Sequence, residues 1–263
     1  MSRASGSPPA SRDWDADTYH RVSGPQLEWG LEVLARLPLS GDETVLDAGC
    51  GSGRVTAELL ERLPNGSVIA VDAAPSMVAA AREVLPADRV DVRACDLLEL
   101  ELESEVDAVF STATFHWIAD HARLYSVVHR SLRPGGRLVA QCGGEGNIAG
   151  LHTTIDEVGA RELFCSYLAR WQGPWNYASA QDTEQRLQVA GFDQIHCWLE
   201  PRLTIPPDPP AFLRSVCLRA HLDRLPAELR GPFVAAVLAE STDAAGRVEI
   251  DYVRLNIDAR RPA

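Results

Sequence analysis

Three glycines alternate with other residues directly after a short apolar run, and this stretch has the chemistry to hold a ligand. Residues 45–54 read Val-Leu-Asp-Ala-Gly-Cys-Gly-Ser-Gly-Arg, and residues 55–60 follow with the apolar rhythm of a helix. A strand, a glycine loop and a helix in this order bring backbone N–H groups and a helix N-terminus close to a cofactor. Glycine is needed because a Cβ would collide with the ligand or forbid the backbone conformation. The stretch predicts a nucleotide-type cofactor site; a tight turn without a ligand is the alternative.

A carboxylate follows where such a site would hold a ribose. The apolar run 67–71 predicts a second strand, and Asp72 ends it 19 residues after Gly53. An acidic side chain at the tip of the second strand can accept hydrogen bonds from both hydroxyls of a ribose. Asp47 and Asp96 lie at the ends of the first and third predicted strands. Three carboxylates at equivalent places favour a binding site over scattered surface charge.

Length and charge restrict the class of protein. A chain of 263 residues can form one large α/β domain with an elaboration. The net charge of −12 argues against a nucleic-acid partner and favours a small neutral or locally bound substrate. All 25 basic residues are arginines, so the sequence excludes a lysine Schiff base and a phosphate-loop lysine.

The cysteines and the apolar runs indicate the compartment. The six cysteines contain no Cys-x-x-Cys pair and form no His-Cys cluster with ligand spacing, so we expect no metal site and a reducing cytoplasm. No apolar run approaches 18 residues, and the N-terminus has no apolar segment that could act as a signal. We therefore expect a soluble cytoplasmic protein without membrane contact.

Strands and helices are predicted to alternate along the chain. After the strand that ends at residue 46, the predicted strands are 67–71, 88–94, 107–111, 137–141, 194–199 and 248–260. The predicted helices are 25–37, 55–60, 75–85, 120–132, 152–170, 180–190 and two within 211–240, broken near residues 226 and 231–232. This alternation predicts an α/β fold, a doubly wound parallel sheet with ligands where the strand order reverses.

The glycine loop points to a family. Its pattern Asp-x-Gly-x-Gly-x-Gly differs from the Gly-x-Gly-x-x-Gly that packs a pyrophosphate, and it resembles the first motif of class I S-adenosylmethionine-dependent methyltransferases. Leu-x-Pro-Gly-Gly at 132–136 is similar to the family's turn into its fifth strand. The resemblance implies a Rossmann-like, seven-stranded, mostly parallel sheet with an antiparallel last strand, and S-adenosylmethionine as cofactor with S-adenosylhomocysteine as product. A nicotinamide-dependent oxidoreductase and a non-catalytic methyltransferase-like binding protein are the alternatives.

The same resemblance divides the chain into parts. Residues 1–12 offer almost nothing to pack and are expected to form a disordered tail. Residues 13–40 would form an N-terminal helical lid, and residues 41–263 the methyltransferase domain. Five prolines within 201–210 predict a linker, and helices within 205–245 would be a cap inserted between the last two strands.

Further motifs resemble one branch of the family, the small-molecule methyltransferases that include the trans-aconitate and juvenile-hormone-acid enzymes. They are Trp14-Asp15-x-x-x-Tyr19, Pro25-Gln26-x-x-Trp29, Phe115-His116-Trp117 and Asp251-Tyr252-Val253-Arg254-Leu255. This likeness implies O-methylation of a carboxylate on a small organic molecule by in-line displacement, in a monomer or homodimer. Methylation of a hydroxyl or a carbon in a natural-product pathway is the alternative.

The resemblance also assigns residues. Those expected at the cofactor are Tyr19, Gln26, Asp47, Ala48, Gly49, Cys50, Gly51, Gly53, Asp72, Ala73, Met77, Cys95, Asp96, Leu97, Thr112 and Ala113. Those expected at the substrate are Trp14, Tyr19, Phe115, His116, Trp117, Trp171 and Trp175. His116, just past the fourth strand, is the catalytic candidate: a substrate contact for a carboxylate, a base for a hydroxyl, or a packing residue.

Aromatic residues late in the chain suggest a wall for an acceptor pocket. Trp171, Trp175, Tyr177 and Trp198 would form it together with the helix at 211–224. Arg214 and Arg219, in the expected cap, are candidate contacts for an anionic group.

Overall fold

The computed structural model describes residues 24–169 and 171–263. The expectations for the tail 1–12, for Trp14 and for Tyr19 lie outside these ranges. Among the described residues, none of the helices combines the length and the apolarity needed to cross a membrane.

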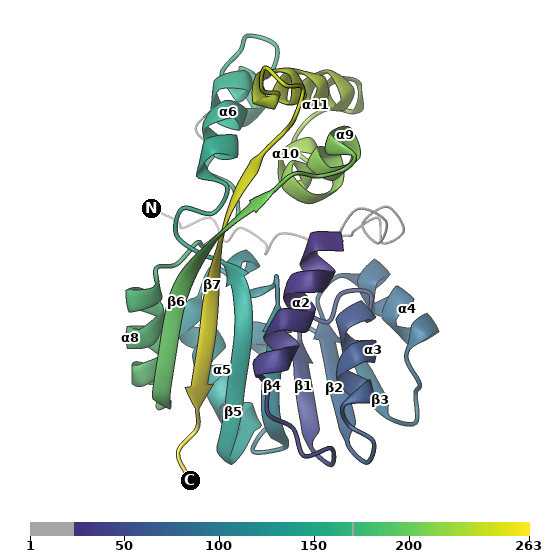
Figure 1. Ribbon diagram of the computed structural model, residues 1–263, viewed down its shortest axis with the longest axis vertical. Helices are drawn as coiled ribbons and strands as arrows, with labels where there is room; N and C mark the ends of the chain where they lie inside the picture. The colour runs from purple at the N-terminus through teal and green to yellow at the C-terminus, as the bar shows by residue number, and fades with distance from the viewer. Residues whose placement is uncertain (1–23, 170) are drawn as a thin grey trace, which may run out of the picture.

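A seven-stranded sheet in the order β3-β2-β1-β4-β5-β7-β6 forms the centre of the molecule (Figure 1). The strands are β1 (Thr44–Ala48), β2 (Ser67–Asp72), β3 (Val90–Ala94), β4 (Val106–Thr112), β5 (Leu132–Gly143), β6 (Asp193–Thr204) and β7 (Ile250–Arg260). The first five are parallel, and β7 runs antiparallel to both β5 and β6. The order reverses between β1 and β4, which is where an open α/β sheet binds its ligands. The predicted fold is confirmed.

Helices cover both faces of the sheet and one end of it. They are α2 (Gly24–Arg36), α3 (Arg54–Glu61), α4 (Pro75–Val84), α5 (His121–Ser131), α6 (Ala149–Gly159), α7 (Cys165–Leu168), α8 (Ala180–Ala190), α9 (Pro209–Phe212), α10 (Arg219–Leu222) and α11 (Ala227–Ser241). Single tight turns form η1 (Leu97–Glu99) and η2 (Phe115–Trp117), and a π-helical turn forms η3 (Leu213–Cys217).

The core has three parts because successive residues of a strand point to opposite faces. Val45 packs with α2, α3 and α4 on one face, whereas Leu46 packs with α5 and α8 on the other. A third apolar cluster joins α6, α9, η3, α10 and α11, which stand together beyond the carboxyl ends of the parallel strands (Figure 1). These helices overhang the edge at which ligands bind.

Three predicted boundaries are wrong. The helix expected at 152–170 is two helices, because the chain turns after Gly159 and Phe164 packs edge-on against Phe233, 5.1 Å between ring centroids. The linker expected from residue 201 begins later, because β6 continues to Thr204 through pairing with β7 and tolerates proline as an edge strand. Pro232 lies inside α11 and does not break it, since the neighbouring side chains of Phe233 and Val234 are buried in the third cluster.

Candidate functional site

The glycine loop is held by three residues in left-handed conformations. Gly49, Gly51 and Gly53 have φ angles of +93°, +54° and +84°. A Cβ on Gly49 would lie 2.0 Å from Oγ1 of Thr114, and one on Gly53 would lie 2.9 Å from Leu85, so packing within the protein requires both glycines. A Cβ on Gly51 would meet no atom of the described residues within 4 Å. The backbone of Gly51 therefore faces an open cradle, the feature expected where a ligand approaches the chain.

Asp72 stabilises this loop from the tip of β2. Its carboxylate accepts hydrogen bonds from the N–H groups of Gly51 (2.9 Å) and Ala74 (2.8 Å). Burial raises the pKa of Asp72 above its ordinary value. The carboxylate thus lies against the glycine loop, as the predicted ribose site requires.

Asp47 is turned into the protein. Its side chain is buried, and its Oδ2 accepts a hydrogen bond of 2.6 Å from the Thr56 hydroxyl. Burial raises the pKa of Asp47 to about 7, and the negative charge of Asp72 adds a smaller increase. In the described structure Asp47 links β1 to α3 and thereby positions the loop between them.

The other residues expected at the cofactor differ in how far their side chains are buried. Ala48, Cys50, Met77 and Leu97 are buried. Ala73 and Asp96 are exposed, whereas Cys95, Thr112 and Ala113 are half-buried. Asp96 accepts a hydrogen bond of 2.9 Å from the Leu98 N–H and so caps η1. Ala113 has φ +55° directly after β4, a conformation that is costly for a residue with a Cβ and that recurs at functional sites.

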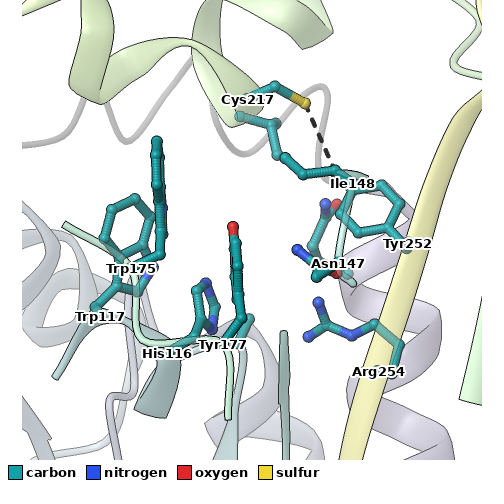
Figure 2. Close-up of a pocket in the computed structure, with 12 residues that line it drawn as sticks. His116, Trp117, Asn147, Ile148, Trp175, Tyr177, Cys217, Tyr252 and Arg254 are labelled. Atoms are coloured by element: carbon teal, nitrogen blue, oxygen red, sulfur yellow. Dashed lines mark hydrogen bonds between the residues drawn. The ribbon is translucent and has the colours of Figure 1, made fainter. Parts of the chain in front are cut away.

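A pocket of about 520 Å³, part of it open to solvent, adjoins Ala113 at the overhung edge (Figure 2). Its lining residues are Gln26, Ala113, His116, Trp117, Asn147, Ile148, Trp175, Tyr177, Val216, Cys217, Tyr252 and Arg254. They come from α2, η2, the connections beside α6 and α8, η3 and β7.

His116 lies at the base of this pocket, stacked on Tyr177 with 5.8 Å between ring centroids. Its Nδ1 accepts a hydrogen bond of 3.2 Å from the backbone N–H of Gly143. Burial, and then the positive charge of Arg254, lowers the pKa of His116 well below its usual range. The ring is therefore neutral, and because Nδ1 is the acceptor, Nε2 carries the proton. The Nε2–H group is therefore the hydrogen-bond donor of this ring.

Two polar residues of the pocket were not predicted as site residues. Arg254 is only 4% exposed, and its guanidinium lies 5.0 Å from the Trp29 ring centroid. Asn147 is buried, and its Oδ1 accepts a hydrogen bond of 3.1 Å from the Val253 N–H. Gln26 contributes a third polar atom, since its Oε1 is buried without a hydrogen-bond partner among the described residues.

The aromatic wall exists, with different members from those expected. Trp117 and Trp175 line the pocket with 5.7 Å between centroids, and Trp175 stacks on Tyr177 at 6.2 Å. Trp171 packs on Trp175 without lining the pocket. Trp198 lies elsewhere, stacked on His196.

Three further residues expected at the substrate are placed away from the pocket. Phe115 is fully buried in the core, 6.1 Å from the Tyr125 ring. Arg214 is exposed, and Arg219 forms a salt bridge with Asp223 at 3.3 Å. Neither arginine lines the pocket. Within the described ranges, no group of three His, Cys, Asp or Glu side chains converges as metal ligands do.

Comparison with known proteins agrees with this architecture. Residues 46–140 match a family described as a methyltransferase domain. The chain is 31% identical to trans-aconitate 2-methyltransferase of Methylobacterium nodulans, over 95% of this chain and 98% of the relative. It is 28% identical to the trans-aconitate 2-methyltransferase of an Acidovorax species, over 85% and 87% of the two chains.

Solved structures share the fold at low identity. Phosphoethanolamine N-methyltransferase 2 of Haemonchus contortus, in complex with phosphomonomethylethanolamine and S-adenosylhomocysteine, superposes with a TM-score of 0.63 at 20% identity, over 94% of this chain and 57% of that chain. The present chain thus spans little more than half of that enzyme's length. A geranyl diphosphate methyltransferase in complex with sinefungin gives a TM-score of 0.52 at 20% identity, over 92% and 79%.

The chain belongs to the class I S-adenosylmethionine-dependent methyltransferases. It is an enzyme that uses S-adenosylmethionine as methyl donor, and both the predicted family and the predicted cofactor are confirmed.

Proposed function

We propose that the enzyme methylates a carboxylate oxygen of a small organic acid. The observation that carries this proposal is the hydrogen bond from the Gly143 N–H to Nδ1 of His116. It leaves the only polar hydrogen of the imidazole on Nε2, so His116 can orient an acceptor oxygen but cannot take its proton. The relatives named for trans-aconitate methylation support the same substrate class.

Among the described residues, no carboxylate of the pocket offers a base. Burial raises the pKa of the Cys217 thiol to about 12 and also raises that of the Tyr177 hydroxyl, so both are protonated at neutral pH. None of the twelve described lining residues is Asp or Glu. A carboxylic acid is already ionised at pH 7, whereas a hydroxyl or a carbon acceptor needs a base. The chemistry of the pocket therefore favours a carboxylate acceptor.

We propose that S-adenosylmethionine binds at the glycine loop, because an open backbone position and a carboxylate lie together there. Bound there, the cofactor supplies a methyl group activated by a sulfonium centre. The cradle at Gly51 admits a ligand at the backbone, and Asp72 is placed to accept bonds from the ribose hydroxyls. We assign Asp96 and Leu97 to the side of the site that holds the adenine. The buried Gln26 Oε1 would accept a hydrogen bond from a donor of the cofactor or of the methyl acceptor.

The chain's own contribution is alignment and exclusion of water. Trp117, Trp175 and Tyr177 wall one side of the pocket, and His116 holds the acceptor oxygen through Nε2–H. Orientation of two reactants in such a site can lower a barrier by roughly 7–11 kcal/mol.

A substrate panel with His116 variants tests the proposal. Purified enzyme and cofactor are incubated with trans-aconitate and other small carboxylic acids, and in parallel with phenols and prenyl compounds, and products are identified by mass spectrometry. We expect methyl esters of acids. His116→Ala should lower kcat/KM about 10- to 100-fold, mainly through KM, because a hydrogen bond to a charged group is lost. His116→Gln, which retains a hydrogen-bond donor, should recover part of the lost kcat/KM.

The pH profile separates an orienting donor from a base. With an ionised acceptor and a neutral His116, kcat/KM should stay within about twofold between pH 6 and 8. His129→Ala, on α5 away from the pocket, is the control for replacement of a histidine. Methylation confined to phenols or carbon centres, with a rate that depends on deprotonation of His116, would contradict carboxyl methylation.

We also propose a reducing, cytoplasmic compartment. All six cysteines of the chain lie in the described ranges and all are free thiols. Four of them are buried, where a free thiol behaves as a small apolar side chain.

A further inference from the structure

We propose that the Tyr177 hydroxyl is a second hydrogen-bond donor to the methyl acceptor, beside His116, and that Asn147 is the positioning residue that turns its hydrogen toward the pocket. This inference adds a substrate contact to the proposed function. It rests on binding of the acceptor in this pocket, and it holds whether the accepting group is a carboxylate, a hydroxyl or a carbon.

Tyr177 extends into the pocket from the connection between α7 and α8. Its ring stacks on His116 and on Trp175, with 5.8 Å and 6.2 Å between the ring centroids. Its hydroxyl points into the pocket, toward the turn that carries Cys217 (Figure 2). A tyrosine placed in this way contributes an apolar wall with its ring and a polar contact with its tip.

The backbone on both sides of Tyr177 is fixed. The N–H of Asn176 donates to the carbonyl oxygen of His116 at 2.8 Å, and the N–H of Glu145 donates to the carbonyl oxygen of Ala178 at 3.0 Å. The segment is therefore tied to the chain that carries His116 and to the loop after β5. A side chain that is ordered in this way loses little entropy when it binds a ligand.

Gly143, the last residue of β5, makes room for the Tyr177 ring. A Cβ on Gly143 would lie 2.7 Å from Tyr177 Cε1 and 3.0 Å from Asn147 Nδ2, so a larger residue would displace both side chains. The N–H of the same glycine donates to Nδ1 of His116 at 3.2 Å. One residue therefore fixes the tautomer of His116 and admits Tyr177 beside it.

Asn147 determines the direction of the Tyr177 hydroxyl. The Oδ1 of Asn147 accepts a hydrogen bond of 3.1 Å from the Val253 N–H, so the other atom of the amide is Nδ2, which can only donate. Among the residues that the structure describes, Asn147 is the side chain that hydrogen-bonds to the Tyr177 hydroxyl. The Tyr177 oxygen therefore receives a hydrogen from Asn147, and its own hydrogen is available for a ligand.

Two donors on adjacent rings make the pocket selective. Burial lowers the pKa of His116 and raises that of Tyr177, so both rings are neutral at neutral pH, with hydrogens on Nε2 and on the hydroxyl oxygen. A molecule whose oxygens reach both hydrogens satisfies them, whereas an apolar molecule of the same shape would leave two enclosed donors unpaired. Tyr177 thus binds and orients the methyl acceptor, and takes no proton from it.

The test removes the hydroxyl alone. The probe is the best-methylated compound of the panel of carboxylic acids, phenols and prenyl compounds, and its binding is also titrated calorimetrically with S-adenosylhomocysteine present. Tyr177→Phe keeps the ring stacking and should raise KM and Kd of the probe about tenfold, with kcat changed less than about threefold and affinity for S-adenosylhomocysteine unchanged. Tyr167→Phe, which removes a hydroxyl from an exposed tyrosine of α7 outside the pocket, is the matched control and should change none of these values.

A double-mutant cycle tests the role of Asn147. Asn147→Asp keeps the oxygen that accepts from Val253 and replaces the Nδ2 donor with an acceptor, which draws the Tyr177 hydrogen away from the probe. The loss of probe affinity caused by Asn147→Asp should be about fivefold larger in wild type than in Tyr177→Phe, because any repulsion by the new charge is common to both. Asn147→Ser, which removes the donor without adding a charge, should show coupling of the same sign and replaces the charged variant if that variant does not fold.

The outcomes separate this contact from the proposed reaction. The unfolding transition and binding of S-adenosylhomocysteine show whether each variant is folded. A folded Tyr177→Phe variant with unchanged KM and Kd, or an equal loss in Tyr167→Phe, overturns the contact, and equal effects of Asn147→Asp with and without the Tyr177 hydroxyl overturn the positioning role. A tenfold loss measured with a phenol or prenyl probe would support the contact and reject carboxyl methylation. A wild type that neither binds nor methylates any compound of the panel overturns both.

Discussion

The cofactor half and the acceptor half of the catalytic edge are built in opposite ways. Most residues that we propose for the cofactor half lie between Asp47 and Leu97, at or just after the carboxyl ends of β1, β2 and β3. The acceptor half combines residues as distant as Gln26 and Arg254, and helices beyond the sheet complete it. The first is determined by local conformation and the second by tertiary packing. Acceptor specificity in this fold can therefore change while the donor site stays the same.

The two halves should respond differently to a single added methyl group, and Gly49→Ala should give the largest effect. The new Cβ would lie 2.0 Å from Thr114 Oγ1 on a residue with φ +93°. Overpacking and backbone strain together should lower the free energy of unfolding by about 3–5 kcal/mol, measured by chemical denaturation without ligand. Binding of S-adenosylhomocysteine should be lost with it.

Gly135→Ala is the matched control for that variant. Gly135 also has a positive φ, +80°, but its nearest neighbour to an added Cβ is Arg260 Nη2 at 3.6 Å, which is an ordinary contact. The Gly135→Ala variant should lose only the free energy of unfolding that the unfavourable backbone conformation costs, about 1 kcal/mol. Equal losses for the two variants would show that the contact with Thr114 does not define the loop.

This contrast explains what the sequence could predict. Alternating strands and helices predicted the α/β sheet, and the glycine loop with Asp72 predicted a nucleotide-type cofactor. The antiparallel last strand and S-adenosylmethionine followed from the resemblance of the motifs to a family. The helix predicted at 180–190 is α8, and the left-handed Gly191, with φ +98°, ends it. The role of His116 was not accessible, because it depends on a hydrogen bond from Gly143, which lies 27 residues further along the chain.

Arg254 was missed for a physical reason that the sequence contains only in part. Arg254 was expected only as part of a C-terminal motif and not as a site residue. In the structure α2 covers this face of β7: Arg254 packs on the Trp29 ring and Asn256 Oδ1 accepts a hydrogen bond from Arg36, so both residues are buried. Polar residues on an interior strand are the signal that would have indicated a site.

The acceptor half should be the acid-sensitive half. His221 is buried against Trp171 and Trp175, and burial lowers its pKa from 6.5 to about 3. Between these values the unfolded chain binds a proton at His221 and the folded chain does not, so stability falls as the pH falls. At pH 5 this histidine should cost roughly 2 kcal/mol relative to pH 8.

His221→Phe tests this difference, because phenylalanine keeps the ring packing and cannot titrate. Between pH 8 and pH 5, the free energy of unfolding should fall less in the variant than in wild type. The difference between the two decreases should equal the cost attributed to His221. Denaturation at both pH values measures it, with pH 8 as the internal reference. An unchanged difference would mean that other groups determine the acid sensitivity.

Gly51→Ala should have the smallest effect on the free protein and still impair the donor half. Within residues 24–169 and 171–263 an added Cβ would meet no atom within 4 Å, so the variant should fold with only the cost of φ +54°, about 1 kcal/mol. If the cradle receives the cofactor, the same Cβ takes space that the ligand needs, and affinity for S-adenosylhomocysteine should fall about tenfold or more. Gly246→Ala is the matched control, because Gly246 has φ +78° and an added Cβ there would also meet no described atom within 4 Å, but it lies in a turn before β7. Both variants should lose similar stability, and only Gly51→Ala should lose affinity; equal titration curves would place the cofactor away from Gly51.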